Sequence, residues 1–575
     1  MRKTSVYLGI LLASMMPLSC FGETYVGSAH GNNGPVTVTL QVEDGVITKV
    51  QAEGVYETPG LGLPALDTVA EEIVQEQSLL VEEVAGATVT SEAVKEAARA
   101  ALLEAGLSLE PYETREVEEE EEEEEDYEAD VAVVGGGFAG MVSAVRAAQL
   151  GAKVVLLERS GLLGGNARFA MGWISGAGFE IQKSLGVEDS PEQFYADIVG
   201  FAGGEENLMV PTATYYAKHS GPALDWLKEQ GVEFKDELNP GIYDPMSVLR
   251  VAWAGHMGTS LISGMQACLD AFEKEGQVKI LMHTNVSELL TEEGAVVGVL
   301  ARKNTGGLVR VAAKSTILAA GGYEANEEVL SGMFDQVARS FMTASKGDTL
   351  RLAMQAGAGT HHMEANTVTG GVLPNDGFYS NIYLDTAYEG LKFVNQEGRV
   401  ITLEGARTLA KSLAWAEAPG NVLYAILPKN AIKEDAPLLS AGNAWMPTAD
   451  KEGELYQELA SEGSLIVEAD SLEELGEKFS ISLDALEGKE GFEEGPFVGI
   501  KTMAYCRWAT GGPLANEKME VLTEDGSVIP GLYVCGEGAG HGLVAGRTPI
   551  SGMYLGMCAT FGLDAAEGAA SYALE

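Results

Sequence analysis

The sequence has little positive charge for its size. Its 575 residues include 37 Lys and Arg but 85 Asp and Glu, which gives a formal net charge of −48. A surface that binds nucleic acid or anionic lipid needs clustered Lys and Arg. We therefore expect no nucleic-acid partner and no electrostatic docking on a membrane, and we attribute the acidic surplus to solubility.

Cysteine is also scarce. The five cysteines are Cys20, Cys268, Cys506, Cys535 and Cys558, and they form neither a CxxC nor a CxxCH motif. Zinc sites, iron–sulfur clusters and c-type haem depend on closely spaced thiols of that kind. The sequence therefore predicts no metal and no haem, while one disulfide stays open for an exported protein.

Long apolar runs are missing beyond the N-terminus. The opening "MRKTSVYLGILLASMMPLSCFGETY" has two basic residues before an apolar stretch at 6–18 that is too short to span a membrane. We expect residues 1–22 to be a secretory signal and the protein to be exported to the periplasm or cell surface. "PLSC" resembles a lipoprotein cleavage box, although Pro17 replaces the usual Leu. A lipid anchor at Cys20 and ordinary cleavage near Gly22 both stay open.

A dinucleotide-binding motif opens the largest part of the chain. "ADVAVVGGGFAGMVSAVRAAQLGAKVVLLERS" reads as strand, tight turn, helix and second strand, with GxGxxG formed by Gly135, Gly137 and Gly140. Glu158 ends the second strand about 20 residues further on, as this α/β fold requires. The glycines let the backbone approach a pyrophosphate at the helix N-terminus. Glu158 is expected to accept hydrogen bonds from the ribose hydroxyls.

Three further glycine-rich stretches favour FAD over NAD. They are "SGLLGGNARFAMGWISGAG", "STILAAGGYEAN" and "GSVIPGLYVCGEGAG". Together with the motif, they resemble the fumarate reductase and succinate dehydrogenase flavoproteins of the flavocytochrome c and urocanate reductase type, from Asp130 to the C-terminus. The resemblance implies an α/β, Rossmann-like domain with non-covalent FAD and an inserted α+β capping (clamp) domain. It places FAD contacts at Gly135, Gly137, Ala139, Gly140, Glu158, Gly165, Asn166, Ala167, Gly172, Val286, Gly321, Asp348, Glu537, Gly552 and Met553.

A small α+β unit precedes this domain. "GPVTVTLQVEDGVITKVQAEG" predicts a β-hairpin and "SEAVKEAARAALLEAGL" predicts a helix. With "YETPGLG" and "VAGATVTS", they resemble the FMN-binding domain of NADH:quinone oxidoreductase subunits. The resemblance implies FMN bound covalently through a phosphoester at Thr88, attached by a flavin transferase. Ala85 and Glu82 stand where that family has Ser or Thr and Asp. In the alternative interpretation, Thr88 and Ser91 merely cap the helix.

An acidic run from Glu118 to Asp126 separates the two units. Like charges repel and no apolar residues accompany them, so the run is predicted to be an extended, mobile tether. The expected organisation is a signal peptide at 1–22, an FMN-binding domain at 23–109, a linker at 110–128, an FAD-binding domain at 129–357 and 495–575, and a capping domain at 358–494.

The resemblance also implies which residues bind the substrate and donate a proton to it. "VAGRTPISGM" matches the family's "GANRLGGNAI" and makes Arg547 the arginine that holds a substrate carboxylate. "RVITLEGAR" keeps the spacing that makes Arg407 the proton donor. Where the family has "HHTMGG", this chain has "RWATGG", so Arg507 and Trp508 replace two histidines, and the match to a third falls near Thr369. Other candidate donors are Tyr505, Arg507, His256, Tyr379 and Tyr383.

These replacements change the expected substrate. The loss of histidines and the gain of a Trp suggest a bulkier, less charged acceptor than fumarate, such as an aryl or alkyl enoate or an enone. We expect hydride transfer from FAD to an activated C=C bond. FMN would relay electrons from a membrane or extracellular donor in anaerobic respiration. Two alternatives stay open: a dehydrogenase working in the reverse direction, and a non-catalytic extracellular electron carrier.

Overall fold

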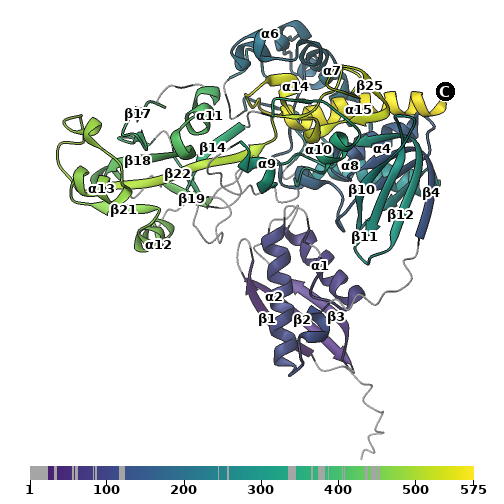
Figure 1. Ribbon diagram of the computed structural model, residues 1–575, viewed down its shortest axis with the longest axis horizontal. Coiled ribbons are helices and arrows are strands. Elements are labelled where there is room, and N and C mark those ends of the chain that lie inside the picture. Colours follow the sequence, from purple (N-terminus) through teal and green to yellow (C-terminus); the bar gives the residue numbers. More distant parts are fainter. Residues whose placement is uncertain are drawn as a thin grey trace, which may run out of the picture.

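The chain forms a small N-terminal domain, a large central body and an elongated lobe that extends from that body (Figure 1). This is a computed structural model. It describes residues 24–31, 35–43, 45–54, 57, 62–81, 83–84, 87–114, 124–241, 243, 245–255, 258–333, 345–363, 367–372, 382–385, 388–403, 406, 408–433, 438–441, 448–449 and 453–575. Within these residues, no helix combines the length and the apolar character needed to cross a bilayer.

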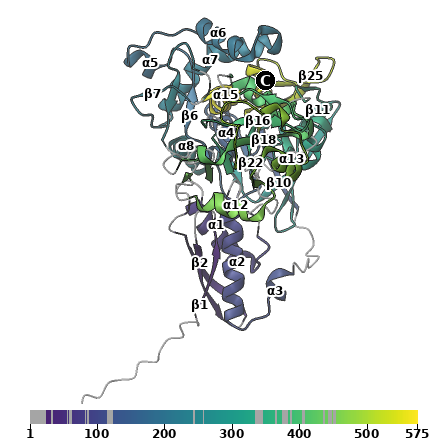
Figure 2. The same cartoon turned by 90° about the vertical axis from the view of Figure 1, so that its left-hand side faces the viewer.

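The N-terminal domain is an antiparallel sheet covered by two helices (Figure 2). Its strands lie in the order β1 (Thr24–His30), β2 (Pro35–Glu43) and β3 (Val46–Glu53), and its helices are α1 (Gly62–Glu76) and α2 (Thr88–Glu104). Alternate residues of β2 are buried against the helices. A Cβ on Gly27 would lie 2.0 Å from Ala97 O, so a glycine is needed where α2 crosses β1. The predicted hairpin and helix are confirmed.

The linker differs from the sequence prediction. A short helix, α3 (Glu110–Glu113), packs on the core of the N-terminal domain through Tyr112, and residues 115–123 lie outside the described residues. Strand β4 (Glu124–Val134) then pairs in parallel with β12 (Leu308–Leu318) from its first residue onward. The prediction of a mobile tether is therefore wrong for Glu124–Asp126, because ladder bonds and the ion pair between Lys303 and Glu125 hold this segment in the sheet.

The central body is built on a mixed sheet with strands β10, β11, β12, β4, β5 and β9 in that order. β25 is a further parallel partner of β12 and also pairs with β24. The predicted unit of strand, glycine turn, helix and strand is confirmed, since β4 and β5 are parallel neighbours joined through α4. The bounds not yet given are β5 (Val154–Leu157), β9 (Val278–Leu281), β10 (Thr284–Glu292), β11 (Ala295–Lys303), β24 (Glu520–Leu522), β25 (Val528–Val534) and α4 (Phe138–Gln149).

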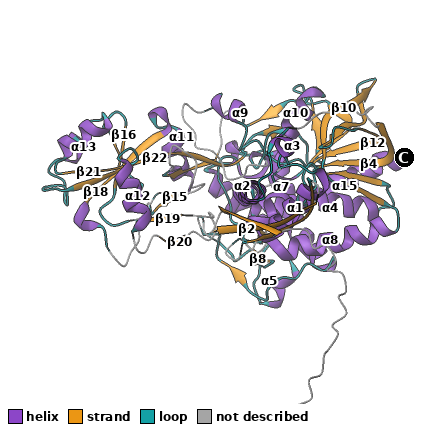
Figure 3. Cartoon of the chain, turned by 90° about the horizontal axis from the view of Figure 1, so that it is seen from below, coloured by secondary structure: helices purple, strands orange, loops and turns teal. Residues whose placement is uncertain are grey.

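Helices cover this sheet and bury its apolar face. The C-terminal helix α15 (Met553–Leu574) packs on α4, on β12 and on α7 (Val210–Glu229), as Figure 3 shows from below. α8 (Thr259–Lys274) packs against α4. The small sheet β6 (Trp173–Ser175), β8 (Val251–Trp253), β7 (Leu238–Asn239) contacts α15 and α7 through β6. The largest core cluster of the described residues lies between these elements.

The elongated lobe is a second α+β unit, which we call the cap. Its sheet has the order β14, β22, β18, β16, β17, with β21 also paired to β22. The long strand β22 belongs to the cap, because it pairs with β14, β18 and β21. It lies beyond residue 494, where the sequence predicted that the cap would end. The bounds are β14 (Thr367–Gly371), β16 (Lys392–Asn395), β17 (Val400–Ile401), β18 (Val422–Pro428), β21 (Ile466–Ala469), β22 (Phe497–Trp508), α11 (Thr408–Ala416), α12 (Glu454–Glu462) and α13 (Leu472–Phe479).

Candidate functional site

The glycine turn after β4 shapes the wall of the main cavity. Gly135 has φ +102°, and a Cβ there would lie 2.6 Å from Ala319 O. Gly140 lets α4 sit close to the turn, since its Cβ would lie 1.9 Å from Gly135 O. Gly137 precedes α4, and a Cβ on it would meet no atom within 4 Å. The N-terminus of α4 therefore opens onto free space, where its amide groups can bind phosphate.

Glu158 is held in a fixed position beside this turn. It follows β5, and its side chain is 9% exposed. Gly136 N donates to Oε2 at 2.7 Å, while Ser160 N and Ser160 Oγ each donate to Oε1 at 2.8 Å. Both carboxylate oxygens are thus oriented by the protein, with lone pairs left for hydroxyl donors of a ligand.

The main cavity runs from Glu158 past the glycine turn to a group of aromatic side chains. Twelve of the fifteen predicted FAD contacts line it: Gly135, Gly137, Ala139, Glu158, Gly165, Asn166, Ala167, Val286, Gly321, Asp348, Glu537 and Gly552. The other three lie away from its wall. Gly140 packs on the turn, Gly172 lets the backbone approach Gly255 O, and Met553 is buried in the core.

Two polar groups in this wall have no partner within the described part of the protein. Asn166 Oδ1 and Trp173 Nε1 are buried without a hydrogen bond, and both residues line the main cavity. A buried polar atom left unpaired costs about 1–3 kcal/mol. These orphaned atoms, with the open space at Gly137 and the held carboxylate of Glu158, fit a dinucleotide such as FAD.

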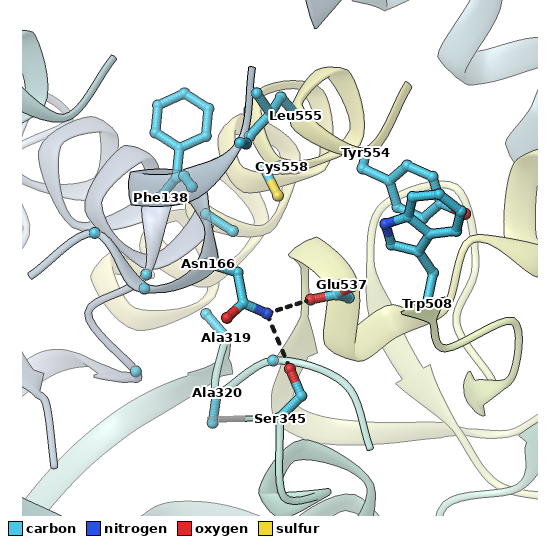
Figure 4. A pocket seen from close by; sticks show the side chains of 18 of the residues that line it. Phe138, Asn166, Ala319, Ala320, Ser345, Trp508, Glu537, Tyr554, Leu555 and Cys558 are labelled. Atoms are coloured by element: carbon cyan, nitrogen blue, oxygen red, sulfur yellow. Dashed lines mark hydrogen bonds between the residues drawn. The ribbon is translucent and has the colours of Figure 1, made fainter. Parts of the chain in front are cut away.

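Aromatic rings form the far end of the main cavity (Figure 4). Trp508, at the end of β22, stacks on Tyr554 with ring centroids 4.9 Å apart. Tyr243 meets Trp508 edge-on at 6.0 Å. Sequence reasoning singled out Trp508 but missed both tyrosines. Their only sequence signal was aromatic character, since folding brings residues 243 and 554 together from distant parts of the chain.

Two carboxyl groups lie beside the same cavity, Glu324 buried and Glu537 partly exposed in the cavity wall. Burial raises the pKa of Glu324, and burial together with the Glu324 charge raises the pKa of Glu537 well above its usual range. Asn166 Nδ2 donates to Glu537 Oε2 at 3.0 Å and to Ser345 Oγ at 2.9 Å (Figure 4). Sequence reasoning found Glu537 and missed Glu324.

Two buried histidines near the cavity were also missed. His541 Nδ1 donates to Ala509 O at 2.9 Å, and burial lowers its pKa to about 3. His361 Nε2 donates to Ala539 O at 2.8 Å, and burial lowers its pKa to about 4. Both imidazoles are therefore neutral near pH 7, and they act as structural hydrogen-bond donors.

The structure describes only some of the predicted catalytic residues. Arg547 is half-buried between α14 (Gly542–Ala545) and the cavity residue Ile550, and it is not itself in the cavity wall. Tyr505 and Arg507 lie on β22, where Tyr505 pairs with Thr369 of β14, and their side chains are outside the described part. The other candidates outside the described residues are His256, Arg407 and Tyr379, and the side chain of Tyr383 on β15 (Ile382–Leu384) is likewise not described.

Two of the stretches predicted to bind FMN meet in the N-terminal domain. Thr90 Oγ1 donates to Glu57 Oε2 at 2.7 Å, which joins "VAGATVTS" to "YETPGLG". Ser91 Oγ accepts a hydrogen bond from Val84 N at 3.0 Å. Thr88 begins α2, and the cap position Ala87 receives no side-chain hydrogen bond. Ser91 thus fastens the loop before the helix, in contrast to the interpretation of it as a cap. The structure does not describe the side chain of Thr88.

This domain also contacts the central body. Leu162 packs on the N-terminal core, and a Cβ on Gly161 would lie 2.4 Å from Glu72 Oε1. Burial raises the pKa of Glu83, but a hydrogen bond with Glu92 and the charges of Lys95 and Lys346 give a net lowering. Lys346 follows the cavity residue Ser345, so Glu83, in the loop before Thr88, lies within electrostatic range of a residue next to the main cavity.

Comparison with known proteins agrees with this geometry. Residues 130–555 match the family described as FAD binding domain, and residues 31–103 match that described as FMN-binding domain. The chain is 27% identical to urocanate reductase from Eggerthella lenta over 563 residues, which covers 91% of this chain and 89% of the relative. It is 28% identical to fumarate reductase (cytochrome) from Shewanella frigidimarina over 459 residues, covering 77% of each chain.

The fold also has a solved counterpart. The open conformation of a flavocytochrome c3 fumarate reductase aligns with a TM-score of 0.57 and 22% identity, covering 78% of this chain and 79% of that one. The predicted fold class and both flavins are thereby confirmed. The chain belongs to the FAD binding domain family, and it is a flavin-dependent oxidoreductase of the fumarate reductase type that uses FAD and FMN.

Proposed function

We propose that this protein is an exported reductase that saturates the activated C=C bond of an enoate or enone bulkier and less charged than fumarate. Electrons enter through FMN attached covalently at Thr88 and pass to FAD in the main cavity. FAD, when bound, supplies the hydride chemistry. The protein residues position the substrate and deliver the proton.

The aromatic end of the main cavity is the observation that carries the substrate class. Trp508, Tyr243 and Tyr554 present apolar ring faces where a dianion such as fumarate would need cations. Ring stacking favours a planar aryl or imidazole substituent and adds about 0.5–1.5 kcal/mol per contact. The Eggerthella lenta relative, named for urocanate, supports the same class.

Two arginines are assigned to the substrate: one binds its anionic end and the other donates the proton. Arg547 lies three residues before Ile550 of the cavity wall. Its guanidinium can hold a carboxylate or polarise a carbonyl. Arg407 donates the proton, with Tyr505, Arg507 and His256 as the alternative donors. Closure of the cap over the cavity excludes water from the reaction.

The contact between the two domains supports an FMN-to-FAD relay. The loop that precedes Thr88 lies near Lys346, next to Ser345 of the main cavity. Attachment by a flavin transferase keeps FMN from diffusing away outside the cytoplasm. Residues 1–22 direct export to the periplasm or cell surface, with or without a lipid at Cys20. There the protein takes electrons from a membrane or extracellular donor in anaerobic respiration.

An anaerobic dye assay tests this proposal. The flavin-loaded protein is reduced with a viologen, and reoxidation of the dye is followed with fumarate, urocanate, cinnamate-type enoates and neutral enones. The proposal expects turnover with a bulky acceptor and little with fumarate. Fast turnover of fumarate contradicts the substrate class. Oxidation of the saturated compounds alone indicates a dehydrogenase, and reducible flavins without turnover indicate an electron carrier.

A further inference from the structure

Glu324 and Glu537 come together because their strands are neighbours. Glu324 follows β12, and Glu537 follows β25 within the short 3₁₀ helix η7 (Gly536–Ala539). β12 and β25 are parallel, with Leu318 opposite Val534, so the residues that follow them emerge at the same edge of the sheet. Ligands of open α/β sheets bind at this carboxyl edge.

Glu324 is fully enclosed, Glu537 is partly exposed where it lines the main cavity, and their side chains lie within hydrogen-bond reach of each other. Glu324 is 0% exposed, and its side chain shares a hydrogen bond with that of Glu537. Ala509 N donates to Glu324 Oε1 at 2.5 Å. Asn166 Nδ2 donates to Glu537. Among the described residues, neither carboxyl forms an ion pair.

A hydrogen bond between two carboxyl groups requires a proton. Two carboxylates without a cation cannot both ionise at this separation in a buried site, so one proton stays between them. The titratable groups that face the pair are the thiols of Cys506 on β22 and Cys558 on α15. Burial raises the pKa of both thiols, and the nearby glutamates raise it further, so both stay neutral. The pair therefore carries one negative charge beside the main cavity.

We propose that the Glu324–Glu537 pair takes up a second proton when the FAD held in the main cavity is reduced, which makes Glu324 a residue that tunes the cofactor through Glu537. Glu537 lines the cavity, and Glu324 lies behind it. Reduction by two electrons from a viologen places negative charge next to the pair. One solvent proton then converts the shared carboxyl–carboxylate into two carboxylic acids, and no other bond forms or breaks.

Uptake of the second proton removes the negative charge of the pair beside the reduced cofactor. Protonation of the pair on reduction stabilises the reduced state relative to the oxidised state, and the gain grows as pH falls. This inference rests on FAD binding alone and does not depend on the substrate or on the FMN relay.

Infrared difference spectroscopy of the FAD-loaded full chain tests the inference without any substitution. Reduction of the wild-type protein is expected to convert one carboxylate into a carboxylic acid, which gains a protonated C=O band and loses a carboxylate band. A reduced-minus-oxidised spectrum without this conversion overturns the proposal.

Proton uptake provides the second measurement, with Glu324→Gln as the variant and Cys506→Ser as its matched control. The amide keeps a hydrogen bond to Glu537 but cannot bind the extra proton. Full reduction in the presence of a pH indicator is expected to consume one proton fewer per molecule in Glu324→Gln, with a lower FAD potential at acidic pH. FMN contributes equally to all three proteins and cancels. Equal uptake in wild type and Glu324→Gln, or loss of the proton in Cys506→Ser, overturns the assignment.

Discussion

Thr90 Oγ1 donates a hydrogen bond to Glu57 Oε2 at 2.7 Å, and both side chains are buried. This contact fastens the first turn of α2 to the segment that precedes α1. The hydroxyl of Thr90 satisfies a carboxyl group that is only 3% exposed. The two sequence stretches predicted to hold FMN are therefore parts of one structural site, two residues from the predicted attachment point at Thr88.

Thr90→Val is expected to weaken this site without touching Thr88. The substitution keeps the shape of the side chain but leaves Glu57 Oε2 without its donor, which costs about 1–3 kcal/mol of folding free energy. Thermal unfolding of the protein should shift downward, and the yield of covalent flavin should fall. Thr90→Ser, which keeps the hydroxyl, is the control and should resemble the wild type. Equal stability of all three proteins contradicts this role for Thr90.

Thr88→Ala is expected to abolish covalent FMN and to leave FAD bound. The phosphoester needs the hydroxyl oxygen of Thr88, whereas FAD occupies the other domain. Intact-protein mass spectrometry and flavin fluorescence of the denatured protein measure the two cofactors separately. Retention of covalent flavin in Thr88→Ala would show that the attachment point is elsewhere.

Two glycines of the same motif are expected to respond differently to alanine. At Gly137 a Cβ meets no atom within 4 Å, so Gly137→Ala should fold normally and lose at least tenfold in FAD affinity, about 1.4 kcal/mol, because the methyl group enters the phosphate space. At Gly140 a Cβ would lie 1.9 Å from Gly135 O, so Gly140→Ala should destabilise the apoprotein by about 1–3 kcal/mol or more. Urea unfolding and FAD titration separate the two effects. Normal FAD binding by Gly137→Ala contradicts the phosphate assignment.

Asp564 on α15 predicts a pH dependence of stability. Tyr215 OH donates to its Oδ1 at 2.9 Å, and burial raises the pKa of this carboxyl to about 7, against about 3.9 in an unfolded chain. Between these values the folded protein keeps the proton while the unfolded chain releases it. The free energy of unfolding therefore falls as pH rises from about 4 to about 7.

Asp564→Asn should remove this contribution. Urea unfolding at about pH 5 and about pH 8 should show a smaller loss of stability for the variant than for the wild type. Tyr215→Phe, which removes the donor and keeps the carboxyl, should retain the pH dependence. An identical pH profile for Asp564→Asn and wild type rules out the raised pKa.

Local sequence predicted the parts of the fold that local geometry determines. The glycine turn, α4, β5 and Glu158 lie within about 30 residues, a spacing that defines the dinucleotide motif.

Features that depend on long-range packing were not predictable from local sequence. Glu324 and Glu537 meet because β12 and β25 are parallel neighbours, although more than 200 residues separate them. Tyr243 and Tyr554 reach the cavity from two different elements. The acidic run misled the prediction because repulsion in isolation gives no sign that Glu124 has a strand partner.

Reaction of the reduced protein with an acceptor in a single turnover tests the central claim most directly. The flavin-loaded protein is reduced under anaerobic conditions, freed of excess dye and mixed rapidly with an aryl enoate. The predicted result is reoxidation of the flavin in step with the appearance of the saturated acid, measured by absorbance and mass spectrometry, and slower reoxidation by fumarate. Flavin that stays reduced with every enoate and enone, or that fumarate reoxidises fastest, would contradict the account.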